Sequence, residues 1–364
     1  MTPAFTNDRW LYIGAFVPMA NARHAGGRVA FENLRDLRNT YDAVDAIVCT
    51  TEPESVAPAP PDVRVFRQRG SDLGWYLLCA SGSLTLQQML TAPVLHTRLQ
   101  RACQSALEDL MREHEYAGLF VDFTQTALLV RRAAEASDCF APTTLCIHDV
   151  FAQRLLRSRH FMERRLTGSV LREEFSLLSS MDHVLTLSEK DRQLAQTLYA
   201  LPSVFVKNFV PPEWHARVRR DQVEPDTLLF FANFERSENR DGARWFVLEV
   251  LPEIRLALPG VSLTLVGNGS DRLAKELACA GVRGTGFVED PSSHFSRCSL
   301  AIAPLLAGAG VKFKVLEALS AGVPVVGTPV ALEGIKPQRG LTCCKQEQFA
   351  WVVLDFLSLP AQPK

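Results

Sequence analysis

Two lysines that follow a glycine-rich turn are the residues of this sequence best placed to bind an anion. Gly308 and Gly310 have no side chains, which lets a phosphate approach the backbone, and they precede Lys312 and Lys314. Only eight of the 39 basic residues are lysines, so two of them two positions apart form a local concentration. In the first turn of a helix their charges oppose the helix dipole, at a cost of about 0.3–1 kcal/mol. A bound diphosphate would remove this conflict, and we therefore expect an anion site here.

A single helix would carry these lysines and the next acidic residue, Glu317. At 100° per residue, the pattern from Val311 onward puts Phe313, Lys314 and Glu317 on one face and mainly apolar residues on the other. The apolar face would pack on a sheet, and the polar face would look into a ligand cleft. Alternatively, the lysines are solvated surface residues and Lys314 pairs with Glu317 three positions later.

The elements that must position this turn alternate regularly along the chain. Short apolar runs rich in β-branched residues are followed by longer amphipathic segments, which is typical of parallel, doubly wound sheets. We therefore predict an α/β protein of two Rossmann-like domains, with ligands bound in a cleft outside the carboxyl ends of the strands. The predicted strands span residues 10–17, 46–50, 118–123, 143–147, 184–187, 204–206, 228–232, 262–266, 300–304 and 324–328. The predicted helices of the second half span residues 241–258, 271–280, 311–321 and 346–357.

Chain length and one polar segment predict the domain boundaries. At roughly 100–200 residues per domain, 364 residues correspond to two domains. Residues 211–226 are polar and bounded by prolines, as expected of a linker. We expect an N-terminal domain over 1–210 and a C-terminal domain over 227–364.

The composition excludes several classes of protein. Hydrophobic residues make up 47% of the chain and charged residues 22%, which excludes a disordered or coiled-coil protein. The net charge of −1 gives no overall attraction to nucleic acid. Nine cysteines without a CxxC pair indicate thiols in a reducing compartment and no zinc site. Because the sequence shows neither a signal-peptide pattern nor an apolar run of 18 residues, we expect a cytoplasmic protein.

Segments from both halves of the chain resemble, in the same order, the pattern of one enzyme family. Residues 308–335 are similar to the donor site of retaining GT-B glycosyltransferases of family 4, the glycosyl transferases group 1, in their GxGxK-type subgroup. The resemblance covers nearly the whole chain. Its other segments are Gly26-Gly27, His148-Asp149, 182–189, 206–211, 239–242, 265–269 and 286–288.

The resemblance implies a reaction and its partners. Enzymes of this family transfer a sugar from a nucleotide diphosphosugar to an acceptor hydroxyl, with retention at the anomeric carbon. The nucleotide sugar is a substrate, and neither a cofactor nor a metal ion is implied. Domain 1–210 would bind the acceptor and domain 227–364 the donor. The implied pathway is the synthesis of a surface polysaccharide, lipopolysaccharide or related glycoconjugate.

The resemblance also implies roles for individual residues. His148 would touch the donor sugar, Lys314 would stabilise the leaving diphosphate and Glu317 would hold the ribose hydroxyls. The loop at Gly26-Gly27 would close on the diphosphate; the alternative is a simple turn. Phe287 and Val288 would flank the base. The full set of nucleotide-binding residues would be Gly26, Gly27, Arg240, Gly267, Phe287, Val288, Gly308, Gly310 and Lys312.

The sequence departs from the family pattern in two segments. Ala309 stands where many relatives carry a second glutamate, and Arg236 and Arg240 are the only basic residues where relatives often place a phosphate-binding arginine and lysine. Phosphate binding would therefore depend on Lys312 and Lys314. Two other functions stay open, namely a nucleotide-sugar epimerase on the same scaffold and a non-catalytic partner protein.

An arginine-rich segment over 151–172 has two interpretations. It holds six arginines against one acidic residue, Glu163, and carries several large apolar residues. Such a segment could lie on the inner face of an anionic membrane or bind a lipid-linked acceptor. The plainer interpretation, which we favour, is an amphipathic helix whose arginines are solvated or paired with Glu173 and Glu174.

Overall fold

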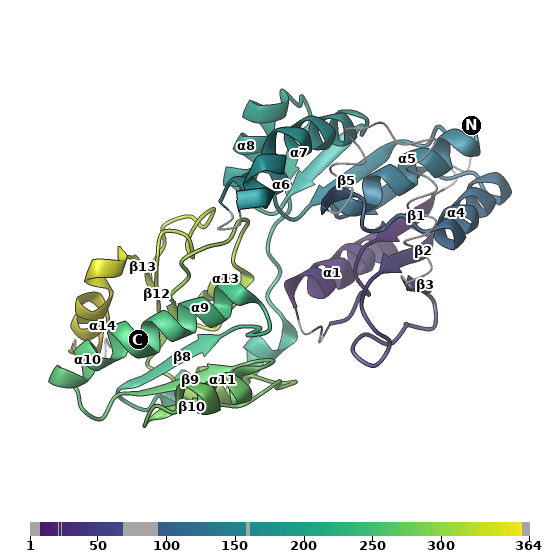
Figure 1. Ribbon diagram of the computed structural model, residues 1–364. Helices are drawn as coiled ribbons and strands as arrows, with labels where there is room; N and C mark the ends of the chain where they lie inside the picture. Colours follow the sequence, from purple (N-terminus) through teal and green to yellow (C-terminus); the bar gives the residue numbers. More distant parts are fainter. Residues whose placement is uncertain (1–7, 21, 23, 68–93, 158–160, 359–364) are drawn as a thin grey trace. The chain divides into compact units, whose positions relative to one another are not determined.

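A computed structural model describes residues 8–20, 22, 24–67, 94–157 and 161–358. The chain divides into two compact units, Met1–Asn208 and Phe209–Lys364. In Figure 1 the first unit runs from purple to teal and the second from teal through green to yellow. Each unit is built around one parallel sheet.

The first unit contains a seven-stranded sheet in the order β3-β2-β1-β4-β5-β6-β7. All neighbouring strands are parallel. The strands are β1 (Arg9–Gly14), β2 (Ala43–Thr50), β3 (Arg64–Arg67), β4 (Gly118–Asp122), β5 (Thr143–Ile147), β6 (His183–Thr186) and β7 (Val204–Val206). The helices are α1 (Ala25–Thr40), α4 (Arg101–Glu113), α5 (Ala127–Ala136), α6 (Phe151–Leu156), α7 (Phe161–Ser179) and α8 (Glu189–Tyr199), with a 3-10 turn η1 (Thr124–Thr126).

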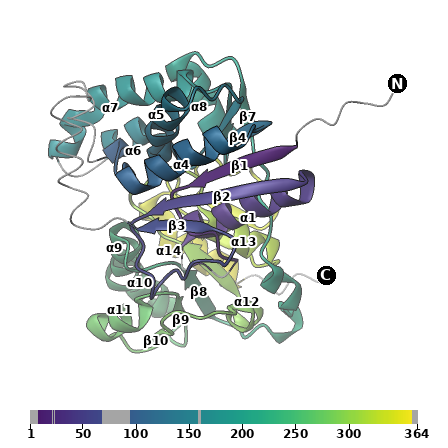
Figure 2. The same cartoon turned by 90° about the vertical axis from the view of Figure 1, so that its right-hand side faces the viewer.

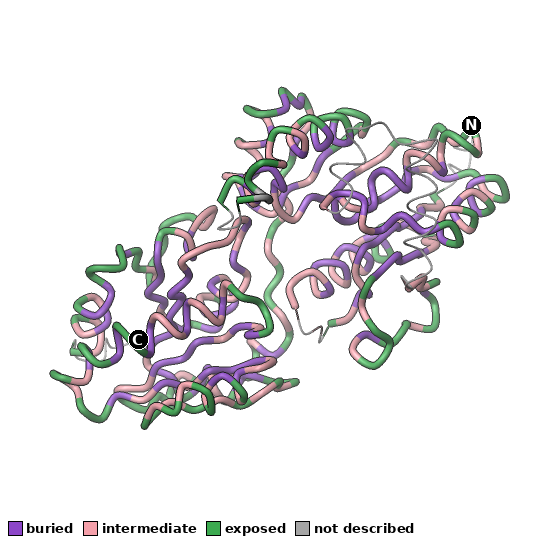
Figure 3. Tube along the Cα trace, viewed as in Figure 1, coloured by how far each residue is buried: buried purple, intermediate pink, exposed green. Residues whose placement is uncertain are grey.

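Both faces of this sheet are covered, because successive side chains of a strand point to opposite sides. Leu11 and Ile13 of β1 join the core under α4, α5, α7 and α8. Tyr12, between them, joins a second core with Leu34 and Leu37 of α1. Figure 2 shows α1 on one side of β1 to β3 and α4 on the other. Such two-sided burial explains why the central strands β1, β2, β4 and β5 are mainly apolar, and these strands are buried along most of their length in Figure 3.

The second unit repeats this plan with six parallel strands in the order β10-β9-β8-β11-β12-β13. The strands are β8 (Thr227–Phe231), β9 (Ser262–Val266), β10 (Val282–Gly284), β11 (Leu300–Ala303), β12 (Val325–Gly327) and β13 (Leu341–Cys343). The helices are α9 (Ser237–Trp245), α10 (Leu251–Ala257), α11 (Ser270–Leu277), α12 (Ser292–Arg297), α13 (Phe313–Ser320) and α14 (Phe349–Ser358), with a 3-10 turn η5 (Gln346–Gln348). The predicted fold class of two Rossmann-like, doubly wound parallel sheets is confirmed.

One predicted helix is interrupted in the structure. The sequence indicated a single helix over 241–258, but α9 and α10 are joined by a π-helical turn, Phe246–Val250. Pro252, near the start of α10, has no backbone N–H to donate to the preceding turn, and its ring crowds the carbonyl four residues back. A widened turn before the proline accommodates it.

The segment predicted as a linker, 211–226, lies within the second unit in the structure. It forms two 3-10 turns, η2 (Glu213–Arg217) and η3 (Arg220–Gln222). Trp214 is buried and stacks on Phe295, with 4.8 Å between ring centroids. These contacts attach the segment to α12.

Candidate functional site

The glycine-rich turn lies where a ligand site is expected in a doubly wound sheet. In both units the strand order reverses beside the first strand, between β1 and β4 and between β8 and β11. Ligands of open parallel sheets bind outside the carboxyl ends of the strands at this switch point. The turn follows β11 directly, so the second unit presents it at its own switch point.

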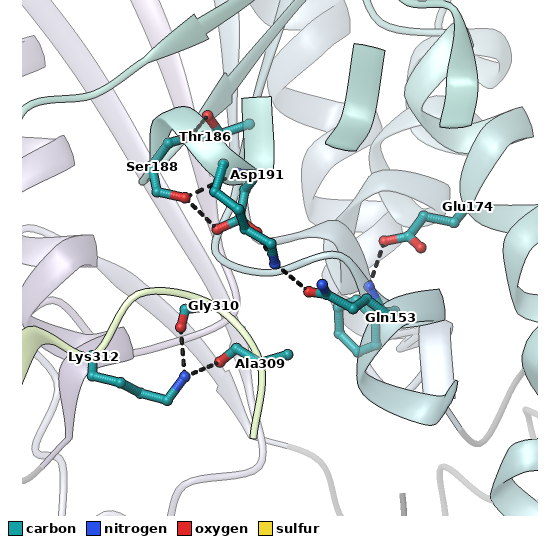
Figure 4. A network of polar contacts seen from close by, with 10 residues as sticks. Gln153, Glu174, Thr186, Ser188, Asp191, Ala309, Gly310 and Lys312 are labelled. Atoms are coloured by element: carbon teal, nitrogen blue, oxygen red, sulfur yellow. Dashed lines mark hydrogen bonds and ion pairs between the residues drawn. The ribbon is translucent and has the colours of Figure 1, made fainter. Parts of the chain in front are cut away.

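The turn depends on its glycines for its shape. Gly308 has a φ of 123° and Gly310 a φ of 69°, conformations that residues with side chains rarely adopt. Lys312 is the N-cap residue of α13, and its Nζ donates hydrogen bonds to the carbonyls of Ala309 (3.0 Å) and Gly310 (2.6 Å), as Figure 4 shows. The ammonium of Lys312 therefore holds the turn together in this structure.

Lys314 is a partly buried cation in the first turn of α13. Its Nζ donates a hydrogen bond to Oδ1 of Asn239 and lies 5.5 Å from the centroid of the Phe230 ring. Burial lowers the pKa of Lys314 to about 7, and repulsion from Arg236 and Lys312 adds to this effect. The hydrogen-bond partner is a neutral amide, so the positive charge gains little compensation for the water it has lost.

Asn239, which orients Lys314, is a residue that sequence analysis did not assign to the site. It is buried in α9, and its Nδ2 donates to the carbonyl of Asn233 at 2.6 Å, which fixes the orientation of the amide. The hydrogen bond with Lys314 connects the helix that follows β8 to the helix that follows β11. The two residues are 75 positions apart, so no local pattern could have paired them.

Glu317 does not lie on an open face. It is 1% exposed, although the helical pattern placed it beside Lys314 on a face turned to a cleft. Its charge acts to raise the pKa of Lys314, but burial of the lysine outweighs it. The i,i+3 alternative is not the contact seen for the ammonium, because Nζ of Lys314 bonds to Asn239.

Two predicted nucleotide-binding residues of the second unit shape its backbone. Gly267 has a φ of 127°, and a Cβ there would lie 2.1 Å from the carbonyl oxygen of Ala232, so only glycine fits between the ends of β8 and β9. Arg240 donates to the carbonyls of Phe234 (3.3 Å) and Glu235 (2.6 Å) in the loop after β8. Their nucleotide-binding roles stay predictions.

The segment predicted to flank the base follows β10. Phe287 is 40% exposed, whereas Val288 is partly buried against the core of the second unit. Oγ of Ser270, the first residue of α11, accepts hydrogen bonds from the backbone N–H groups of Thr285 (3.1 Å) and Gly286 (2.9 Å). This fixes the chain just before Phe287 and leaves its ring accessible.

Gly26 and Gly27 do not form a loop in the structure. They lie in the first turn of α1, and His24 caps this helix by accepting a hydrogen bond from the backbone N–H of Gly27 at 3.2 Å. A Cβ on Gly26 would lie 2.8 Å from the Phe16 ring, and one on Gly27 would lie 2.7 Å from Cβ of Ala22. The glycines are needed because the preceding segment packs directly against the helix start.

His148 lies just beyond β5, in contact with a buried carboxylate. Its Nε2 is 2.8 Å from Oδ1 of Asp122, the last residue of β4. Asp122 also accepts hydrogen bonds from the Tyr12 hydroxyl (2.7 Å) and from Nδ2 of Asn33 (3.0 Å). Burial alone would lower the pKa of His148, but the Asp122 carboxylate and a contact with Cys146 raise it to about 10. Asp122 was not predicted as a site residue, although an acidic residue at the end of a buried strand was a usable signal.

Three of these groups could be considered as metal ligands. Asp122, Cys146 and His148 each bring one potential ligand atom within 4.8 Å of the others. Both carboxylate oxygens of Asp122 already accept hydrogen bonds, from Tyr12, Asn33 and His148. The geometry therefore favours a hydrogen-bonded cluster.

The arginine-rich segment 151–172 forms α6 and the first part of α7. Leu156 and Phe161 are 61% and 64% exposed, and Arg165 lies over the Phe161 ring at 4.7 Å. Glu174, suggested as a partner for the arginines, is buried and accepts hydrogen bonds from the backbone N–H groups of residues 151 and 152 and from a tyrosine hydroxyl. Arg159 lies outside the described residues. Membrane contact through this surface stays the less favoured of the two interpretations. Within the described residues no helix is long and apolar enough to cross a bilayer.

A family model matches most of the second unit. Residues 225–358 match the model described as glycosyl transferases group 1. The matched range covers less than half of the whole chain. The matched range includes β8 to β12, α9 with Asn239, and α13 with Lys314 and Glu317.

Solved structures share the architecture of the entire chain. Sucrose-phosphate synthase from Thermosynechococcus elongatus aligns over 96% of this chain and 88% of its own, with a TM-score of 0.64 and 14% identity. Anabaena HepE, solved with UDP-glucose, aligns over 96% and 88%, with a TM-score of 0.61 and 12% identity. The lipopolysaccharide outer core galactosyltransferase WaaB aligns over 96% and 90%, with a TM-score of 0.58 and 14% identity. At these identities the likeness shows the fold, which is GT-B.

One curated relative comes from a region named cps. An uncharacterized 44.6 kDa protein in the cps region of Klebsiella pneumoniae is 26% identical over 171 residues. The match covers 44% of this chain and 43% of that protein. The part of this chain that aligns therefore spans less than half the length of that curated relative.

Proposed function

We propose that this protein is a retaining glycosyltransferase that transfers a sugar from a nucleoside diphosphosugar to an acceptor hydroxyl. The observation that carries this proposal is Lys314, a partly buried ammonium hydrogen-bonded to a neutral amide at the switch point of a glycosyl transferases group 1 domain. Glu238 and Glu317 act to raise the pKa of this ammonium, but burial and two neighbouring cations outweigh them, and a diphosphate would add the negative charge needed to keep it protonated. The backbone N–H groups of Phe313 and Lys314 precede the first hydrogen bond of α13, from Val315 to the carbonyl of Lys312 (2.9 Å), and offer further donors to the same anion.

The chemistry follows from where charge develops during transfer. The bond between the anomeric carbon and the diphosphate oxygen breaks, and the sugar passes through an oxocarbenium-like state. Negative charge gathers on the leaving diphosphate, where the ammonium of Lys314 stabilises it without rearrangement. The acceptor oxygen bonds to the anomeric carbon on the same face, and its proton passes to the leaving phosphate oxygen. This route needs no carboxylate nucleophile and no metal ion.

The remaining predicted roles fit this proposal to different degrees. Phe287 is accessible for stacking on a base, and His148 lies at the carboxyl end of β5, where a donor sugar is expected. Glu317 is almost fully buried, so the site must open before its carboxylate can reach ribose hydroxyls. A surface polysaccharide or lipopolysaccharide acceptor is supported by the relative from the cps region and by the fold shared with a lipopolysaccharide galactosyltransferase.

The test is nucleotide release from a panel of donors. The protein is incubated with UDP-glucose, UDP-galactose, UDP-N-acetylglucosamine and GDP-mannose, and the released nucleoside diphosphate is measured. We expect slow release from one donor, reduced about 10²-fold or more by Lys314→Ala. Lys275→Ala, which removes an exposed lysine of α11, is the matched control and should retain the wild-type rate.

Other outcomes would overturn the proposal. Interconversion of two nucleotide sugars would indicate an epimerase instead. Binding of a nucleotide without release from any donor or acceptor mixture would indicate a non-catalytic protein. Once an acceptor is found, NMR of the product gives its anomeric configuration, and an inverted product would contradict retention.

A further inference from the structure

We infer that Asp122 is a positioning residue that holds the His148 imidazole with Nε2–H toward its carboxylate, which leaves Nδ1 for a ligand at the switch point of the first sheet. This inference rests on the proposed function and deepens it. It concerns the first unit, where sequence analysis singled out His148 but gave it no partner. None of the residue roles proposed above depends on Asp122.

Hydrogen bonds, in addition to packing, set the orientation of the Asp122 carboxylate. The carboxyl group is completely buried, and it accepts from Tyr12 of β1, Asn33 of α1 and His148 after β5. Three donors from three elements leave the carboxylate a single orientation. Removing a carboxylate from water is costly unless its hydrogen bonds are satisfied, and here they are.

The imidazole ring is also fixed from its sides. The Phe16 ring lies nearly parallel to it at 6.2 Å, with an interplanar angle of 26°, and the Phe123 ring meets it edge-on at 5.0 Å. Phe123 follows Asp122 directly and has a φ of 84°, an unfavourable conformation for an aromatic residue. Backbone strain of this kind costs about 1–3 kcal/mol and persists where surrounding contacts enforce it, often at functional sites.

The position in the fold indicates that the pair serves a ligand. β1 and β4 are the two neighbouring strands at the switch point of the first sheet. Asp122 ends β4, and Tyr12 comes from β1, so the hydrogen bond between them joins these two strands. His148 follows the carboxyl end of β5, the next strand. Side chains at this edge are those that meet a ligand in doubly wound sheets.

The protonation state follows from the partner. A carboxylate only accepts hydrogen bonds, so Nε2 of His148 must carry the proton between them. Nδ1 is then the nitrogen left for a ligand, as an acceptor on the neutral ring or a donor on the cation. The titratable groups around the ring in the described residues are Asp122 of β4, Cys146 of β5 and, through Asp122, Tyr12 of β1. Because the pair raises the pKa of His148 to about 10, Nδ1 is a donor at neutral pH, suited to a sugar hydroxyl or phosphate oxygen.

Asp122 could instead only tie β1, α1 and β5 together, and a matched variant separates the two roles. Asp45 of β2 accepts hydrogen bonds from Nε of Arg9 (2.7 Å) and from the Tyr116 hydroxyl (2.8 Å). It therefore resembles Asp122 in having a cationic and a phenolic donor. Arg9 is the first residue of β1, so this pair lies toward the amino ends of the strands, away from the edge where ligands bind.

The experiment compares Asp122→Asn with Asp45→Asn in the full-length protein, using release of nucleoside diphosphate from the active donor. We expect Asp122→Asn to lower kcat about 10–100-fold with little change in KM. In this variant activity should also fall as pH rises through roughly 6.5, because His148 without the carboxylate loses its proton near the ordinary pKa of histidine. Asp45→Asn should change neither constant. Equal effects of the two substitutions, or an Asp122→Asn enzyme with the wild-type pH profile, would overturn the inference.

A second measurement does not depend on activity. NMR of protein labelled with ¹⁵N-histidine, with His148→Gln used for assignment, reports the tautomer and the titration of His148 in the wild-type chain. The inference predicts a proton on Nε2 and a titration midpoint well above that of Asp122→Asn. A wild-type His148 without that proton, or one titrating near 6.5, would overturn it even if the variant does not fold. If the wild type releases nucleotide from no donor, the proposed function fails, while this spectrum still decides on the pair.

Discussion

Lys314 is the residue whose proposed role, binding a diphosphate, depends most directly on its pKa in the free protein. Its pKa is lowered to about 7, chiefly by burial, whereas an ordinary lysine titrates near 10.5. A bound diphosphate would favour the charged form and raise this pKa again. The lysine should therefore take up a proton when a nucleoside diphosphate binds at slightly alkaline pH.

We predict that UDP, or the diphosphate of the active donor, binds with uptake of up to one proton at pH 8 and with weaker affinity as pH rises above about 7. Calorimetry in two buffers of different ionisation enthalpy measures the uptake. Lys314→Met should bind more weakly and abolish most of it, whereas Lys275→Met should behave like the wild type. Binding by the wild-type protein without proton uptake at pH 8 would contradict this assignment.

At the scale of elements, the position of Lys314 depends on how closely α9 approaches β11. A Cβ on Gly242 of α9 would lie 2.4 Å from the carbonyl oxygen of Pro304, which directly follows β11. The absence of a side chain thus lets the helix that carries Asn239 reach the strand from which the glycine-rich turn departs. The glycine is needed here for close approach and not for an unusual backbone conformation.

We predict that Gly242→Ala lowers the free energy of unfolding by about 1–3 kcal/mol, because backbone atoms must move to admit the methyl group. It should also weaken nucleotide binding, since the shift separates Asn239 from Lys314. Gly168→Ala in α7 is the matched control, with no atom within 4 Å of the added Cβ. It should be neutral or stabilise the protein by up to about 1 kcal/mol. Chemical denaturation of both variants measures the difference, and equal stability would contradict the close-packing argument.

At the scale of the whole molecule, the two units hold titrating groups with opposite effects on stability. The pKa of His148 in the first unit is raised from 6.5 to about 10, so its stabilising contribution is complete below pH 6.5 and is lost as pH rises toward 10. The pKa of Lys314 in the second unit is lowered from 10.5 to about 7. Between pH 7 and pH 10.5 the lysine is protonated in the unfolded chain and neutral in the folded protein, so its effect is that stability increases with pH over this range.

We predict that each variant differs from the wild type in a pH-dependent way. His148→Gln should lower Tm most at pH 6 and progressively less toward pH 10. Lys314→Met should raise Tm at pH 6 to 7, by an amount equivalent to about 0.5–2 kcal/mol, with the gain disappearing near pH 10.5. Scanning calorimetry of the three proteins across this range measures both trends. A pH-independent difference for either variant would show that the residue titrates normally in the folded protein.

The sequence alone determined the architecture and the location of one candidate site. Alternating apolar and amphipathic segments indicated two doubly wound sheets, because strands buried on both faces must be apolar throughout. The glycine-rich turn was recognisable because the conformations of Gly308 and Gly310 depend on a local property, the absence of a side chain. The strand before that turn was predicted to end at Pro304 and ends at Ala303, and the helix after it was predicted to begin at Val311 and begins at Phe313.

Only the tertiary structure decided which side chains meet. Asn239 bonds to Lys314 across 75 positions, and Tyr12 bonds to Asp122 across 110, because strand order places elements that are distant in sequence at one switch point. In the tertiary structure the ammonium of Lys312 also bonds to the carbonyl of Gly310 in the glycine-rich turn, and Glu317 is buried. A sequence pattern indicates which face of an element a residue occupies. Its hydrogen-bond partners and its loss of solvation depend on what packs against that face. Partners and solvation in turn determine the charge states of Lys314 and His148.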